Sequence, residues 1–158
     1  MNQPTPESSA LAAIFRAGLI CGVMDITAAF LTWWPQGVAP ARLLKGIAGG
    51  VLGPQASAGG WPVAVLGLAC HFFIAYSAAT VFYLASRQLT FLITRPVISG
   101  VLYGVCVYLV MYWIVVPLSR LHRRPTSVKA TIIAIITHII CVGLPISLTI
   151  RRFSRSSS

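Results

Sequence analysis

Acidic residues are nearly absent from this chain. Only Glu7 and Asp25 carry carboxylates among 158 residues, against 12 lysines and arginines. Charged residues make up 9% of the sequence, whereas a soluble domain carries about 25%. This deficit excludes an ordinary soluble domain. A hydrolase built on paired carboxylates is also excluded, because one of the two acids lies in a polar N-terminal segment. We therefore expect no enzymatic activity.

Motifs for metal and phosphate binding are missing as well. The four cysteines are spread along the chain, and no CxxC, CxxCH or HExxH motif occurs. The glycine-rich stretch GIAGGVLGP is not followed by Gly-Lys-Ser/Thr, so it is not a phosphate loop. No cofactor and no metal is therefore expected on motif grounds.

Apolar residues are what the sequence has in abundance. They make up 57% of it, and the mean hydropathy is +0.84. Four apolar runs reach the roughly 20 residues that a membrane-spanning helix needs, at about 10–34, 61–86, 97–118 and 130–150. Tryptophans mark the run ends, as interfacial anchors do. We predict an all-α, integral membrane four-helix bundle over 10–150, between a polar tail at 1–9 and a basic tail at 151–158.

A short amphipathic segment, 40–53, lies between the first two runs. Its apolar residues recur at helical spacing, and Arg42 and Lys45 lie off that stripe. Pro40 suits a first helical turn. This pattern predicts a helix on the membrane surface. The glycines of the segment leave a re-entrant segment as the alternative.

The net charge of +10 comes from basic residues at the ends of apolar runs. This placement favours anionic lipid headgroups over nucleic acid as the partner. The expected headgroup contacts are Arg42, Lys45, Arg123, Arg124, Arg151 and Arg152. Six basic residues fall on each side of a four-span protein, so their count does not set the orientation. We place both termini in the cytoplasm, because Arg42 and Lys45 lie on a segment that can pack against protein.

The two halves of the sequence resemble each other. A shift of 82 residues aligns GLICG, which holds Gly18 and Gly22, with GVLYG, which holds Gly100 and Gly104. The second apolar run of each half carries one histidine, in ACHFF and ITHII. We predict two helical-hairpin repeats related by an axis along the membrane normal. Each GxxxG motif permits close helix contact, so spans one and three are expected to meet, and a homo-oligomer is expected.

The stretches GLxxGVxDIT, GGWxxAxLGLxxHFxIA, RPVxSGxLYGVxVY and HxxCVGLPIxL cover most of the chain, from about residue 18 to residue 153. In these stretches the sequence resembles a group of small bacterial inner-membrane proteins with four predicted spans. The resemblance implies a bacterial inner membrane and a shared architecture. It transfers no functional residue.

Three ionisable residues lie near the middle of predicted spans: Asp25, His71 and His138. A lone aspartate at a helix centre costs roughly 2.5 to 3.5 kcal/mol in insertion experiments. Asp25 is therefore expected to face the bundle and to bond to one of the histidines. Arg42 or Lys45 would be the partner of Asp25 instead if the amphipathic segment dips inward.

These residues favour a small transporter- or channel-like protein with a proton-sensitive site within the membrane. A non-catalytic interaction or assembly protein, in which the same polar core is structural, is the first alternative. A haem- or metal-binding electron carrier is the second, with the two histidines as axial ligands or with Cys21, Cys70 and Cys141 nearby as further ligands. The residues identify no substrate.

Overall fold

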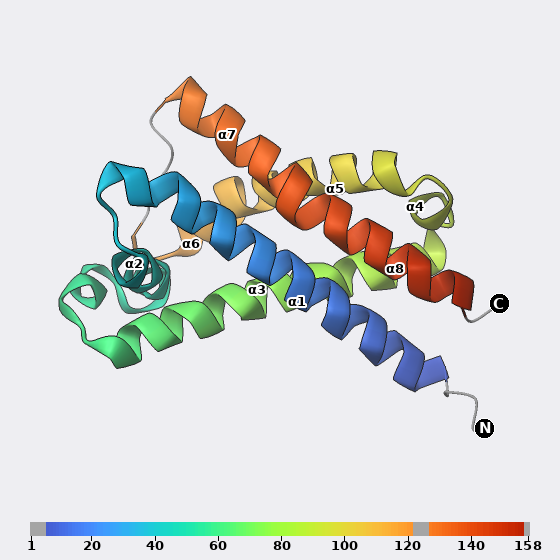
Figure 1. Cartoon of the computed structure of the whole chain (residues 1–158), viewed down its shortest axis with the longest axis horizontal. Helices are drawn as coiled ribbons and strands as arrows, with labels where there is room; N and C mark the ends of the chain where they lie inside the picture. The colour runs from blue at the N-terminus through green and yellow to red at the C-terminus, as the bar shows by residue number, and fades with distance from the viewer. Residues whose placement is uncertain (1–5, 122–126, 157–158) are drawn as a thin grey trace.

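Four long apolar helical segments run side by side through most of the molecule (Figure 1). The computed structural model describes residues 6–121 and 127–156. The windows long and apolar enough to cross a membrane are Ala10–Gln36, Trp61–Gln88, Pro96–Leu118 and Val128–Ser154. The described residues form helices and no strand. The predicted all-α four-helix bundle is confirmed, and the chain is a multi-pass integral membrane protein.

The first two spans are single helices, whereas the last two are interrupted. Span one is α1 (Pro6–Trp33) and span two is α3 (Trp61–Gln88). Span three joins α5 (Pro96–Val110), the π-helical turn η3 (Met111–Val115) and α6 (Val116–Leu118). Span four joins α7 (Val128–His138), the π-helical turn η4 (Ile139–Gly143) and α8 (Leu144–Ser156).

Both π-helical turns have the same cause. Proline clashes with the carbonyl group four residues earlier and cannot donate a hydrogen bond to it. For Pro117 that carbonyl belongs to Trp113, inside η3, and for Pro145 it belongs to Cys141, inside η4. The wider turn accommodates each ring within a continuous helix.

The helices extend further than the apolar runs. α1 begins at Pro6 and α8 ends at Ser156, so helix covers part of both regions expected to be tails. Backbone hydrogen bonding continues a helix into polar residues, whereas hydropathy marks only the buried length. Arg151 and Arg152 thus lie on the last turns of a helix. Arg123 and Arg124 lie outside the described residues.

Between spans one and two, the chain forms η1 (Trp34–Gln36), α2 (Pro40–Leu52) and η2 (Pro54–Ala58). α2 ends at Gly53, whose φ of 88° favours glycine. α2 packs against the start of α3, where Gly67 lies directly against the carbonyl oxygen of Leu44. The carbonyl group of Gly50 also accepts a hydrogen bond, 2.9 Å long, from the backbone N–H of Arg120. α2 is therefore docked on protein. The short α4 (Phe91–Thr94) joins spans two and three.

Small side chains form the centre of the bundle. α1 contributes Ala13, Ala17 and Cys21, while α3 contributes Ala75, Ala79 and one large residue, Phe82. Span four adds larger residues, Val142, Ile146 and Ile150. Small residues permit the close backbone approach that stabilises helices in lipid, where burial of apolar area adds little.

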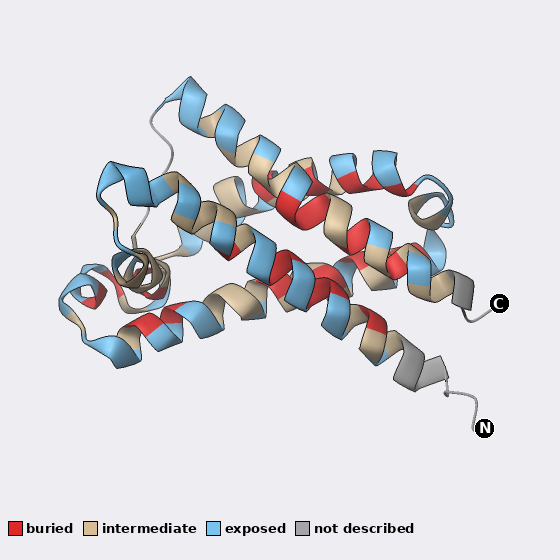
Figure 2. Cartoon of the chain, in the orientation of Figure 1, coloured by how far each residue is buried: buried red, intermediate tan, exposed pale blue. Residues whose placement is uncertain are grey.

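The outer surface is apolar over all four spans. Large exposed side chains include Leu31, Phe73, Leu102, Trp113 and Ile140. Figure 2 shows the buried residues gathered where the helices face one another, with exposed residues along their outer faces. Apolar residues on both the inside and the outside are what a bundle surrounded by lipid requires.

The glycine motifs pack within each hairpin. A methyl group added at Gly22 would lie 2.6 Å from Cε1 of Phe72 on α3, and Gly18 contacts the Tyr76 ring. A methyl group at Gly104 would lie 2.6 Å from Cα of Ile139, and one at Gly100 2.9 Å from a methyl carbon of Leu144. The expectation that these motifs join spans one and three is therefore wrong. Each glycine face is occupied by the next span, so neither is left for a dimer contact.

Candidate functional site

A cavity of about 670 Å³ lies between the second half of α1 and α7. The two helices diverge there: α1 packs closely on α8, whereas α7 separates from it toward Val128 (Figure 1). The residues lining the cavity are Asp25, Ala29, Thr32, Trp33, Pro35, Gln36, Ser127, Lys129, Ala130, Ile133, Ala134, Thr137 and His138.

Asp25 and His138 mark the deep end of this cavity. They are the lining residues on α1 and α7 that lie furthest from Trp33 and Lys129 along their helices. At 1.5 Å per residue, Asp25 lies roughly 12 Å deeper than Trp33, and His138 roughly 14 Å deeper than Lys129. The carboxyl group and the imidazole therefore share one cavity at nearly the same depth in the bundle.

The Asp25 carboxyl group is half-buried in this cavity. Among the described residues, none hydrogen-bonds to it or forms an ion pair with it. The thiols of Cys21 and Cys141 lie close enough to interact with its charge. Asp25 is therefore an ionisable group within a span that faces this cavity.

The side chain of His138 is held by its own helix. Its Nδ1 atom lies 2.8 Å from the carbonyl oxygen of Ala134. A carbonyl oxygen only accepts, so Nδ1 carries a proton. The buried Tyr108 ring packs edge-on against the imidazole, with ring centres 5.7 Å apart. In the neutral ring Nε2 is then an acceptor, which can take a proton or a hydrogen bond.

His71 occupies a different environment. Its Nε2 atom lies 2.9 Å from the carbonyl oxygen of Gly22 on α1, and the residue does not line the cavity. Because Gly22 has no side chain, Phe72 and Ala75 of α3 lie close to the α1 backbone beside this bond. The expected bond between Asp25 and a histidine is therefore not formed. His71 is satisfied by a main-chain group, and His138 by its own helix.

Arg42 and Lys45 do not line the Asp25 cavity either. They line a separate cavity of about 440 Å³ beside α2 and η2. α2 docks on the start of α3, which holds these two side chains near the end of the bundle. The alternative prediction, that Arg42 or Lys45 is the partner of Asp25, is thus also wrong.

Five polar residues of the cavity were not predicted as part of a site: Thr32, Gln36, Ser127, Lys129 and Thr137. Their spacing contained the signal. On the first span, positions 25, 29, 32 and 36 follow one helical face, and on the fourth so do 130, 134 and 137. Lys129 places a positive charge at the mouth, opposite in sign to Asp25.

The described residues contain no group of three or more His, Cys, Asp or Glu side chains arranged to hold a metal ion. The two histidines also do not face a common space, since only His138 lines the cavity. Among the described residues, His71 and His138 thus do not form a pair of axial ligands for a haem.

The fold and this cavity define a multi-pass helical membrane protein with ionisable groups inside its spans. Comparisons with protein-family models, with curated proteins and with solved structures found no match to this chain.

Proposed function

We propose that the protein is a small transporter- or channel-like protein whose proton-sensitive site consists of Asp25 and His138. The observation that supports this most directly is their position at the deep end of one polar-lined cavity. Residues that only stabilise the bundle would bond to each other or to neighbouring helices, as His71 does.

In this proposal, the protonation state of the Asp25 carboxyl group determines whether the site attracts a cation. An ionised carboxylate at this depth is costly unless water, a cation or a proton compensates it. The cavity gives such species access, since polar residues line it from Asp25 out to Gln36 and Lys129. Protonation of Asp25 removes the charge and with it the attraction for a cation.

His138 is placed to respond to the same protons. Its Nδ1–H is engaged with Ala134, which leaves Nε2 to gain or lose a proton. A positively charged His138 would favour an ionised Asp25 in the same cavity and would disfavour a cationic solute there. The pair thus links solute occupancy to pH without any catalytic step.

A structural role is the second candidate, and one observation favours it for part of the predicted core. The bond from His71 to Gly22 joins spans one and two through a main-chain group. An interaction or assembly protein would need only such bonds.

We also propose that the protein resides in a bacterial inner membrane with both termini in the cytoplasm. The start of α1 and the end of α8 lie at the same end of the bundle, as four spans require (Figure 1). The docking of α2 on α3 supports this orientation, because Arg42 and Lys45 then belong to a packed segment. A homo-oligomer would have to use surfaces other than the glycine faces.

The test is proton flux in vesicles reconstituted with purified protein and an internal pH-sensitive dye. We expect Asp25→Asn to insert and fold normally yet to abolish pH-dependent flux, because Asn keeps the shape but cannot ionise. His138→Gln should retain some flux and lose most of its pH dependence.

The matched control is His71→Gln, which changes the histidine outside the cavity. We expect this variant to keep the flux and its pH dependence. Full flux in well-folded Asp25→Asn would overturn the proposal. Loss of folding in Asp25→Asn, with normal flux from the folded fraction, would support the structural candidate instead.

A further inference from the structure

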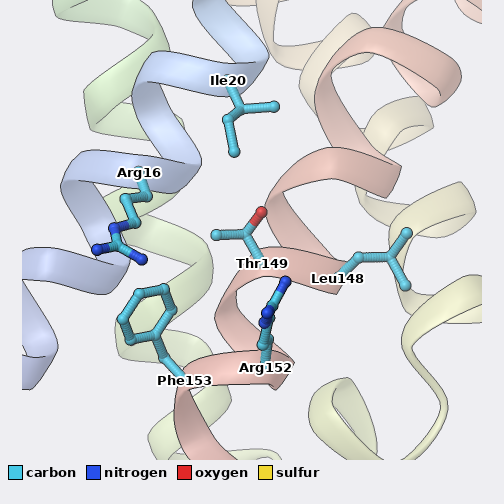
Figure 3. A pocket seen from close by; sticks show the side chains of 6 residues that line it. All are labelled: Arg16, Ile20, Leu148, Thr149, Arg152 and Phe153. Carbon is cyan, nitrogen blue, oxygen red and sulfur yellow. The ribbon is translucent and has the colours of Figure 1, made fainter.

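A third cavity, also of about 440 Å³, lies at the opposite end of α1, between α1 and α8. Its lining residues are Arg16, Ile20, Leu148, Thr149, Arg152 and Phe153. Figure 3 shows Arg16 on α1 facing Phe153 and Arg152 on α8 across the space between the two helices, with Thr149 on the α8 side of this space. The proposed proton site plays no part in this cavity.

Two arginines from different spans give this cavity its charge. The Arg16 guanidinium group lies over the Phe153 ring, 5.2 Å from the ring centre. This cation–π contact orients Arg16 and reduces the entropy lost on binding a ligand. Arg152 reaches the same space from α8, and none of the six lining residues is acidic. The site is therefore preorganised for an anion.

The apolar part of the lining lies on the membrane side of the arginines. α1 enters the membrane from this end, so Ile20 is one turn deeper than Arg16. α8 leaves the membrane at this end, so Leu148 is one turn deeper than Arg152. A ligand that fills the cavity thus meets cationic groups at the outer level and apolar groups about one helical turn, roughly 5 Å, further in.

We propose that this cavity binds the phosphate group of an anionic phospholipid. The planar guanidinium groups match phosphate oxygens in geometry, and the threonine hydroxyl can donate a further hydrogen bond. Ile20 and Leu148 would contact the start of an acyl chain. Free phosphate uses the same cationic groups but gains nothing from the apolar wall, which is why a lipid is the favoured source.

This site differs from general attraction to a charged surface. Each basic residue near a membrane contributes about the same modest electrostatic attraction, wherever it lies. A built site instead depends on Arg16 and Arg152 far more than on another arginine at the same membrane face. Arg87 is such an arginine: it is exposed, ends span two at this face and does not line the cavity.

The experiment measures lipid binding to delipidated protein in detergent by native mass spectrometry. The probes are phosphatidylglycerol and phosphatidylcholine with identical acyl chains. We expect one phosphatidylglycerol to bind preferentially per chain. Arg16→Gln and Arg152→Gln should each weaken this binding about tenfold, as expected for losing a charge-assisted hydrogen bond. Phe153→Leu should weaken it about threefold, because Arg16 is no longer held.

Arg87→Gln is the matched control and should change the affinity by less than about twofold. An equal effect of Arg87→Gln would overturn the site in favour of general surface charge. Displacement of the lipid by millimolar inorganic phosphate would overturn the lipid assignment in favour of a free-phosphate site. Should a glutamine variant fail to fold, Arg16→Lys and Arg152→Lys keep the charge and should still lose several-fold in affinity, since lysine lacks the planar fork.

Discussion

The Nε2 atom of His71 lies 2.9 Å from the carbonyl oxygen of Gly22, the second glycine of GLICG. In the other half, the second glycine of GVLYG, Gly104, lies against the backbone of His138 and Ile139. In both hairpins, then, the second glycine of the motif lies next to the histidine of the following span, or next to its backbone. This correspondence agrees with the predicted internal repeat. The two halves differ in the partner of the histidine ring. His71 bonds to the neighbouring helix, whereas His138 bonds to its own helix.

Loss of the His71 bond should reduce stability and leave transport intact. We expect His71→Leu to lower the free energy of unfolding by about 0.5 to 1.5 kcal/mol, the usual range for an interhelical hydrogen bond. His71→Gln should recover part of this loss, because an amide can still donate to Gly22. Unfolding in mixed micelles measures both values. A loss above about 4 kcal/mol would show that His71 holds more than this one bond.

Alanine substitutions at glycine should separate packed from open positions. Gly104→Ala should cost about 1 to 3 kcal/mol, because its methyl group would meet main-chain atoms of His138 and Ile139 that cannot move aside. Gly22→Ala should cost less, since the Phe72 ring can shift. Gly46→Ala is the control: nothing lies within 4 Å, and alanine favours helix by up to about 1 kcal/mol. Equal effects at Gly104 and Gly46 would contradict the observed packing.

Asp25 should react with a membrane-permeant carbodiimide, which modifies protonated carboxyl groups. The sequence has only one other acidic residue, Glu7, so mass mapping assigns the product unambiguously. We expect labelling of Asp25 to decrease as pH rises, because the ionised group reacts poorly, and to be absent in Asp25→Asn. Labelling that does not change with pH would show that the carboxyl group is not in exchange with protons.

Removing Pro145 should displace His138 from its place opposite Asp25. Without the ring, η4 can close into an ordinary α-helical turn, which rotates α7 relative to α8 by about 100°. We expect Pro145→Ala to lower Asp25-dependent flux roughly tenfold or more, as misplacement of a functional group does. Pro117→Ala removes the equivalent proline of span three and serves as control. Unchanged flux in Pro145→Ala would show that the π-helical turn is not needed to position His138 in the site.

Local patterns predicted the helices well for a physical reason. A span must be apolar over the bilayer thickness, and lipid leaves no alternative to an internally bonded helix. The apolar runs at about 61–86 and 97–118 therefore predicted spans that the structure has at Trp61–Gln88 and Pro96–Leu118. Pro40 and Gly53 likewise bound α2 through their own backbone preferences. Such properties belong to each segment and need no partner.

The choice of partners was not predictable in this way. Composition indicated that Gly18, Gly22, Gly100 and Gly104 would meet another helix, but either neighbour was compatible with the motif. Only the assembled bundle pairs each glycine face with the following span. The reason is that helix contacts in lipid depend on the match between two surfaces, which one sequence segment does not contain.

The candidate site shows both what local sequence predicts and what only the tertiary structure decides. The sequence alone determined that Asp25 and His138 are ionisable groups at mid-span, because depth follows from position along a helix of known rise. The tertiary structure decided that these two share a cavity while His71 bonds to Gly22. Helix rotation and the π-helical turn of span four set which side each group faces. The turn follows locally from Pro145, whereas the rotation arises from contacts between residues far apart in the chain.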